Sequence, residues 1–120
     1  MPYIKYSFEK LEIYELAQEL VLGVYNITEK FPREEIYALT SQVRRAAVSV
    51  VLNIVEGSIG RSRKDFARFV GQSIGSLVEV KAGLILAGRL KYITQSDFLE
   101  ILPLIDKLFF KSISFKKSLL

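Results

Sequence analysis

The 120-residue chain contains no cysteine and no histidine. The absence of cysteine excludes disulfide bonds and thiolate nucleophiles, and the absence of both residue types excludes Cys/His zinc sites. Without histidine, no imidazole is available as a general base near neutral pH. Because only carboxylates, lysines, tyrosines and hydroxyls remain, the composition argues against an enzyme, and it predicts neither a metal site nor a cofactor.

The sequence also lacks a long apolar run. The longest, Ala46 to Leu52, is interrupted by Ser49, whereas a helix needs about 20 apolar residues to span a bilayer. The N-terminal segment contains no apolar core of the length found in signal peptides. Half of the residues are nevertheless hydrophobic. We therefore expect a cytoplasmic protein, with no membrane partner, whose excess of apolar surface favours self-association.

Acidic side chains are scarce in the C-terminal two-thirds of the chain. Residues 1–43 carry four basic and seven acidic side chains, whereas residues 44–120 carry thirteen basic and six acidic ones. The net charge is therefore −3 in the first segment and +7 in the second. A basic segment of this kind suits a polyanionic partner such as nucleic acid. It equally suits a bundle whose acidic and basic helices attract one another with nothing bound.

Apolar periodicity and capping residues predict four helices in a single domain that covers residues 1–120. The expected helices are residues 7–30, 32–56 and 63–91, and a fourth helix that follows a short loop at residues 92–96 and runs to about residue 117. Gly57 is expected to end the second helix with a positive φ, and Thr94 or Ser96 to cap the fourth. Pro103 is expected to kink the fourth helix or to divide it into two pieces.

The segment from Leu39 to Gly60 has two apolar faces when its residues are placed at helical spacing. The first is an ordinary core face and consists of Leu39, Val43, Ala46, Ala47, Val50 and Ile54. The second lies on the far side and consists of Val48, Val51, Leu52 and Val55. A lone bundle exposes one side of each helix to water, so the second face predicts a subunit interface. The alternative is a fully buried central helix, which is hard to build in so short a chain.

A polar stripe runs beside the core face of the same helix and consists of Gln42, Arg45, Ser49, Asn53 and Glu56. An acid in the last turn opposes the helix dipole, so Glu56 is expected to be largely buried and paired with a cation. The candidate cations are Arg45, Arg61 and an arginine of a neighbouring helix. We interpret Arg45, Ser49, Asn53 and Glu56 as a structural polar network rather than as a catalytic cluster.

The turn between the second and third helices is the best candidate site. Free backbone N–H groups at the start of a helix attract anions, and three cations crowd the same turn. The residues predicted to contact phosphate are Arg61, Arg63, Lys64 and Arg68, with Arg89, Lys91, Lys116 and Lys117 as secondary candidates. The alternative interpretation is a capped connection between helices whose basic residues are merely solvated.

The run from residue 41 to residue 80 carries a combination of residues that is typical of one bacterial family. Its first half has Gln42, Arg44, Arg45, Ala46, Ser49, Asn53, Ile54, Glu56 and Gly57, and its second half has Phe66, Phe69, Gly75, Ser76 and Glu79. This pattern closely resembles the signature of the four helix bundle protein family, also called the 23S rRNA-intervening sequence protein family. Leu11, Tyr25, Phe31-Pro32 and residues 90–93 match as well, so the resemblance covers nearly the whole chain.

Two positions depart from the pattern. The family often has proline where this chain has Val51, so the second helix is expected to be straighter here. The family often has glycine where this chain has Lys91, which makes the tight turn before Tyr92 the feature least supported by the resemblance.

The resemblance implies an all-α, antiparallel up-down four-helix bundle that assembles into a ring, typically a homopentamer. The chain is similar to accessory proteins of diversity-generating retroelements, which form such rings and bind nucleic acid and a reverse transcriptase. We therefore predict a non-enzymatic homo-oligomer that binds RNA or DNA through basic surfaces. The alternative is a protein-interaction scaffold, or a reverse-transcriptase accessory protein without sequence-specific RNA binding of its own.

Overall fold

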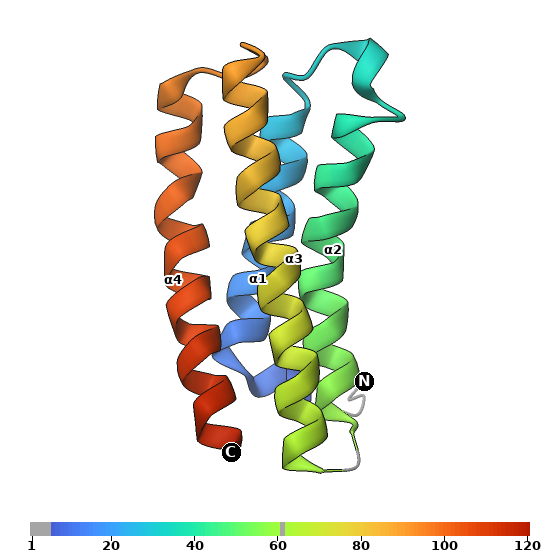
Figure 1. Ribbon diagram of the computed structural model, residues 1–120, viewed down its shortest axis with the longest axis vertical. Helices are drawn as coiled ribbons and strands as arrows, with labels where there is room; N and C mark the ends of the chain where they lie inside the picture. The colour runs from blue at the N-terminus through green and yellow to red at the C-terminus, as the bar shows by residue number, and fades with distance from the viewer. Residues whose placement is uncertain (1–5, 61) are drawn as a thin grey trace, which may run out of the picture.

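The computed structural model describes residues 6–60 and 62–120, and within them it is all-helical. The four long helices are α1 (Glu12–Thr28), α2 (Leu39–Ser58), α3 (Arg63–Arg89) and α4 (Gln95–Leu119). Two short 3₁₀ helices, η1 (Ser7–Lys10) and η2 (Arg33–Glu35), precede α1 and α2. Successive long helices run side by side in opposite directions (Figure 1). The predicted all-α four-helix bundle is confirmed.

The order of the helices around the bundle decides which faces point outward. Contacts join α1 to α2, α2 to α3, α3 to α4 and α4 back to α1. No contacts join α1 to α3 or α2 to α4 in the described chain, so these pairs lie diagonally opposite each other. In Figure 1, α3 accordingly stands in front of α1. The outer faces of α1 and α3 therefore point away from each other.

The core is built from apolar residues at helical spacing on each helix. Leu20, Ile54, Leu84 and Leu108, one from each long helix, are completely buried. The predicted core face of α2 is confirmed, since Val43, Ala46, Ala47, Val50 and Ile54 are all buried. Leu39, at the first residue of the helix, is only half-buried.

Helices α2 and α3 approach each other closely because glycine stands at two contact points. A Cβ atom on Gly57 would lie 2.7 Å from the Phe66 ring and 2.8 Å from Phe69 Cβ. A Cβ atom on Gly83 would lie 2.6 Å from Val43 Cγ2. All three distances are far below van der Waals contact, so only glycine fits at these two positions. Gly83 of α3 thus allows this helix to pack closely against α2.

The first two long helices begin later in the structure than the sequence predicts. The helix predicted to start at Ser7 is interrupted at Leu11, whose ψ of 131° is extended. The Glu9 carboxylate accepts a hydrogen bond from the Tyr6 N–H at 2.7 Å, and this bond closes η1 as a separate turn. The helix predicted to start at Pro32 begins only at Leu39, because Ala38 has φ −125° and ψ −107°. Pro32 instead precedes η2.

Side-chain contacts across the end of the bundle explain why residues 32–38 do not join α2. Phe31 is buried, and its ring centroid lies 5.7 Å from that of Tyr92. The Tyr92 hydroxyl donates to the Glu35 carboxylate at 2.6 Å. This bond lowers the pKa of Glu35, as does a second bond from the Leu39 N–H, and it raises the pKa of Tyr92. The segment is therefore held against the turn that follows α3.

The helix ends also differ from expectation. Gly57 was predicted to have a positive φ, but it lies inside α2, and no glycine in the described residues has a positive φ. Lys91 has φ 64° instead, so the turn after α3 forms without the glycine that the family often has there. Pro103 does not divide α4, which is continuous from Gln95 to Leu119. Thr94 caps α4 as predicted, with its Oγ accepting from the Asp97 N–H at 3.1 Å.

Helix α3 is long and apolar enough, by length and composition, to cross a membrane, and it is the one such helix in the described chain. The core helix of a bundle passes the same criterion, so this finding assigns no membrane location. Only 28% of the most apolar 18-residue window of α3 is buried. Much of this helix therefore presents apolar and small residues outward.

Candidate nucleic-acid interface and subunit interface

Basic side chains from two helices meet at one end of the bundle. Arg63, Lys64 and Arg68 lie in the first turns of α3, and Lys116 and Lys117 lie in the last turn of α4. Both helix ends are at the bottom of Figure 1. We call these five residues the basic end. Arg61, the remaining primary candidate, lies outside the described residues.

The secondary candidates do not form one surface. Lys116 and Lys117 join the basic end, whereas Arg89 and Lys91 lie at the other end of the 27-residue helix α3. At 1.5 Å per residue the two groups are about 40 Å apart. The antiparallel arrangement of α3 and α4 explains this division, because the start of one helix lies beside the end of the next.

Two of the predicted phosphate-binding residues already have partners within the chain. Arg63 donates from Nε to the Leu119 carbonyl at 3.3 Å and from Nη2 to the Ser118 carbonyl at 2.5 Å. It thus satisfies carbonyls that the end of a helix leaves without intrahelical donors. Arg68 is paired with Asp65 Oδ1 at 2.9 Å and lies 4.3 Å from the centroid of the Phe69 ring.

The lysines are the more available cations of the basic end. Lys64 and Lys117 are exposed, and Lys116 is half-buried. None of the three lysines has an ion-pair partner in the described part of the chain. Ser62 caps α3 by accepting a hydrogen bond from the Asp65 N–H at 3.0 Å, which occupies one of the amides expected to attract an anion.

The polar stripe of α2 is only partly a network. The Asn53 amide donates to the Ser49 carbonyl and hydroxyl at 2.9 and 3.0 Å, and the Ser49 hydroxyl lies 2.9 Å from that of Ser76 on α3. Arg45 and Glu56 are exposed, and neither has a hydrogen bond or ion pair within residues 6–60 and 62–120. The prediction of a largely buried Glu56 is wrong for the single chain, and Arg61, one of its candidate partners, lies outside the described residues.

Arg44, one of the residues that carry the family resemblance, connects α2 to α1. Its Nε donates to the Thr28 hydroxyl at 2.8 Å, and its guanidinium lies 4.6 Å from the centroid of the Tyr25 ring. Thr28 is buried, and its hydroxyl donates in turn to the Val24 carbonyl at 2.7 Å. The signal in the sequence is weak, since it consists only of a threonine at the end of one helix and an arginine near the start of the next.

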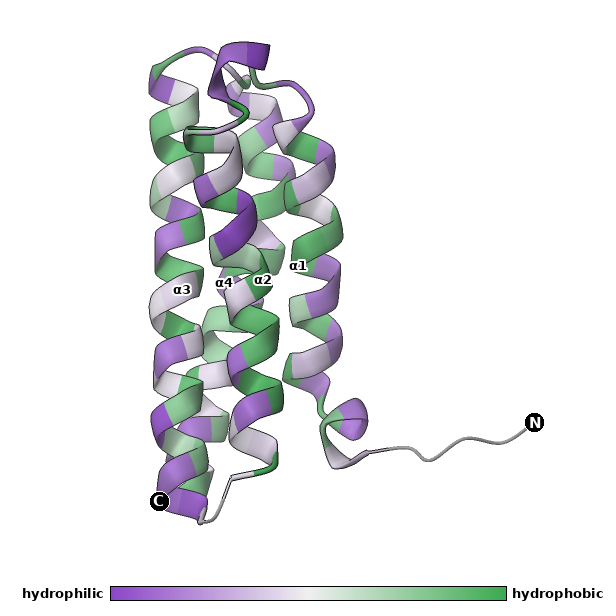
Figure 2. Cartoon of the chain, turned by 90° about the vertical axis from the view of Figure 1, so that its right-hand side faces the viewer, coloured by the Kyte–Doolittle hydropathy of each residue, from purple (hydrophilic) through white to green (hydrophobic). Residues whose placement is uncertain are grey.

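The second apolar face of α2 points outward in the single chain. Leu52 is 58% exposed, and Val48, Val51 and Val55 are half-buried. In Figure 2, the most hydrophobic residues of α2 lie mainly in its C-terminal half. Together with the more exposed Ile59, residues 48, 52, 55 and 59 follow the alternating spacing of four and three that is typical of a helix-packing seam. Their role as a subunit interface remains a prediction.

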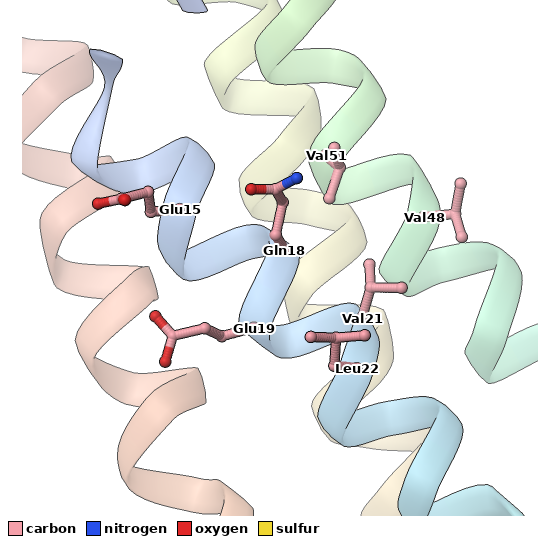
Figure 3. Close-up of a pocket in the computed structure, with 7 residues that line it drawn as sticks. All are labelled: Glu15, Gln18, Glu19, Val21, Leu22, Val48 and Val51. Carbon is pink, nitrogen blue, oxygen red and sulfur yellow. The ribbon is translucent and has the colours of Figure 1, made fainter. Parts of the chain in front are cut away.

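A groove of about 610 Å³ lies between α1 and α2 beside this face. Its apolar lining consists of Val21, Leu22, Val48 and Val51, and its polar lining consists of Glu15, Gln18 and Glu19. In Figure 3, both carboxylates lie on the side of α1 away from α2, and the valines and Leu22 lie between the two helices or on the α2 side. The groove thus has an apolar floor and one acidic rim.

Closely packed antiparallel helices with one basic end and an uncovered apolar side define a small four-helix bundle protein. The family model described as 23S rRNA-intervening sequence protein matches residues 9–112. The chain therefore belongs to this family.

The chain is also similar to a solved structure, described as a protein with unknown function from the S23 ribosomal protein family of Bacteroides thetaiotaomicron VPI-5482. The two share 23% sequence identity and a TM-score of 0.80, over 88% of this chain and 95% of that one. This likeness supports the fold alone. No curated protein sequence matches the chain.

Proposed function

We propose that this protein is a cytoplasmic, non-enzymatic bundle that self-associates and binds nucleic acid, with RNA as the first candidate. The observation that carries the proposal is the basic end, where α3 and α4 bring five cationic residues to one end of the bundle and Lys64, Arg68 and Lys116 line one surface hollow. Its lysines are exposed or half-buried and have no ion-pair partner in the part of the chain that the structure describes.

The chemistry of this end favours contact with phosphate rather than with bases. Lysine ammonium groups act as mobile point charges, and Arg63 and Arg68 are already held by partners within the chain. Binding should therefore depend steeply on salt and little on sequence. One copy offers only a few charges, so useful affinity calls for several copies acting together. The resemblance to ring-forming proteins suggests a pentamer as the assembly.

The test is a titration of the intact protein with a labelled single-stranded RNA of about 30 nucleotides at two salt concentrations. The variant carries Lys64→Gln, Lys116→Gln and Lys117→Gln, which leaves the Arg63 contacts with α4 in place. The matched control carries Arg33→Gln, Lys81→Gln and Lys107→Gln, which removes the same charge outside the basic end. Circular dichroism and light scattering confirm that both remain folded and assembled.

We expect the basic-end variant to bind at least tenfold more weakly and the control variant to bind nearly as well as the wild type. The salt slope should fall by about 0.7 for each phosphate contact removed from a single strand. Equal losses in the two variants would mean that net charge, and not the basic end, attracts the RNA. No binding by the wild type would refute the nucleic-acid function.

The second candidate is a protein-interaction scaffold, for example an accessory protein of a reverse transcriptase. The observation that favours it is apolar surface away from the basic end, with Leu22 71%, Tyr37 95% and Phe110 67% exposed. If the basic-end variant no longer binds RNA but still binds its protein partners in the cell, that result would support the scaffold. Self-association is common to both candidates and is measured first, by light scattering.

A further inference from the structure

The proposed self-association leaves open which surfaces of two copies meet, and the inference drawn here rests on that proposal. We propose that the groove between α1 and α2 of one copy receives the outer face of α3 of the next copy. The contact is therefore head to tail, with two different surfaces on each copy. The occupant of the groove is a second copy of this chain.

The groove side combines protruding apolar side chains with acids that have no partner. Leu22, which lines the groove, is 71% exposed, and Leu52, on the second apolar face of α2, is 58% exposed. Glu15 and Glu19 form the acidic rim and have no ion pair in the described residues. A complementary surface must be apolar or small at its centre and must carry positive charge.

The outer face of α3 has these properties. It consists of Arg68, Gln72, Gly75, Glu79, Ala82, Leu86 and Arg89, all of them exposed and alternately four and three residues apart. Arg89, at one end of this face, has no ion-pair partner in the described residues, whereas Arg68, toward the other end, is paired with Asp65. The one acid of the face, Glu79, already accepts a hydrogen bond from Gln42 at 3.1 Å. This regular spacing is the one that helices use when they pack along their length.

The residues at the centre of the outer face of α3 are small enough to leave room for a leucine from another copy. Gly75 and Ala82 lie there, and a Cβ atom on Gly75 would meet nothing within 4 Å. Unlike Gly83, which must avoid Val43, Gly75 is not required by any contact inside the described chain. A glycine within a helix costs about 1 kcal/mol relative to alanine. Close approach of Leu22 or Leu52 from another copy would explain why glycine stands at position 75 despite this cost.

The position of the two surfaces excludes a two-fold dimer in which each copy uses both. Helices α1 and α3 lie diagonally opposite and do not contact each other, so the groove and the outer face of α3 point in different directions. A copy whose groove is filled still presents its α3 face to another copy. Head-to-tail contacts of this kind form a ring when the rotation closes and a filament when it does not.

The absence of cysteine from the chain allows a direct test with single cysteine variants. Leu22→Cys is mixed in turn with Gly75→Cys, Ala82→Cys and Leu86→Cys, so that different registers along α3 are sampled. The copies are exchanged under dilution, reconcentrated and oxidised mildly, and disulfide-linked dimers are resolved on a non-reducing gel. A disulfide forms only when the two Cα atoms come within about 4.4–6.8 Å of each other. The matched control is Ser114→Cys, an exposed position on α4.

We expect at least one mixture to form a cross-linked dimer in a yield several times that of either variant alone or of any mixture with Ser114→Cys. Cross-linking of Leu22→Cys with itself would indicate a two-fold contact and overturn the proposal. An oligomeric wild type with no cross-link in any α3 mixture would overturn it too, while leaving self-association intact. A monomeric wild type in light scattering would refute self-association itself, and with it this inference.

Discussion

Lys91 is the position at which a single substitution should stabilise the fold. It has φ 64°, in the left-handed region, and its N–H donates to the Gly88 carbonyl at 3.0 Å. The next N–H, of Tyr92, donates to the Ala87 carbonyl at 2.9 Å, so these two bonds close α3 only if residue 91 keeps this conformation. A residue with a Cβ atom costs about 1–2 kcal/mol there, whereas glycine adopts the conformation without a clash.

The expected gain is smaller than this cost, because glycine also increases the entropy of the unfolded chain. That effect opposes folding by about 0.4–1 kcal/mol. The Lys91 side chain is exposed and has no hydrogen bond or ion pair within the described chain, so its removal costs little. We therefore expect Lys91→Gly to raise the free energy of unfolding by about 0.5–1 kcal/mol. For 120 residues this corresponds to about 2–4 °C in Tm.

The assay is urea unfolding followed by circular dichroism at one fixed protein concentration, because self-association makes stability depend on concentration. Lys91→Ala is the matched control, since it removes the same charge and keeps the Cβ atom. It should differ little from the wild type. If Lys91→Gly is no more stable than Lys91→Ala, the strain assigned to the left-handed backbone is absent. An equal gain in both variants would point to the charge instead.

Two further changes test the packing and the charges of the bundle. Gly83→Ala should lower the free energy of unfolding by about 1–2 kcal/mol in urea titrations, because its Cβ atom would lie 2.6 Å from the buried Val43 side chain, whereas Gly88→Ala, with open space around it, should not. Hydrogen bonding from Lys30 lowers the pKa of Asp97 from 3.8 to about 2. Because this pKa is depressed by folding, the stabilisation is complete above about pH 4 and is lost as the pH falls toward 2. Unfolding midpoints measured across this range should therefore depend less on pH in Asp97→Asn than in the wild type.

Sequence periodicity was sufficient for the core but not for the helix starts. The apolar faces of α2 and α3 follow from spacing alone, because a helix must bury one stripe. The interruption before α2 depends on Tyr92, which is 57 residues from Glu35 along the chain and bonds to it only in the folded bundle. Local propensity contains no information about such a contact. The helix itself was predicted correctly, but its predicted start at Pro32 was wrong, since α2 begins at Leu39.

For the candidate sites as well, the sequence predicted the residue types but not their contacts with residues far away along the chain. Sequence alone indicated which residues are basic, and antiparallel helices explain why Lys116 and Lys117 meet the start of α3. It did not indicate that Arg63 is held by the last carbonyls of α4, or that Arg44 reaches the buried Thr28. These partners lie far away along the chain. The exposed Glu56 illustrates the opposite error, in which a helix-dipole argument predicted burial that a single chain does not provide.

The two proposed surfaces occupy different parts of the molecule, and this separation has a consequence for binding. The lysines of the basic end lie at the start of α3 and the end of α4, whereas the groove and the centre of the α3 face lie along the sides of the bundle. Lateral contacts between copies therefore leave these lysines uncovered. In a closed ring, equivalent residues lie at one height along the symmetry axis. The basic ends of all copies would then form a circle of positive charge, and one nucleic-acid strand could contact several copies at once. Disrupting the lateral contact should consequently weaken RNA binding even when every lysine is present, because the copies no longer act together.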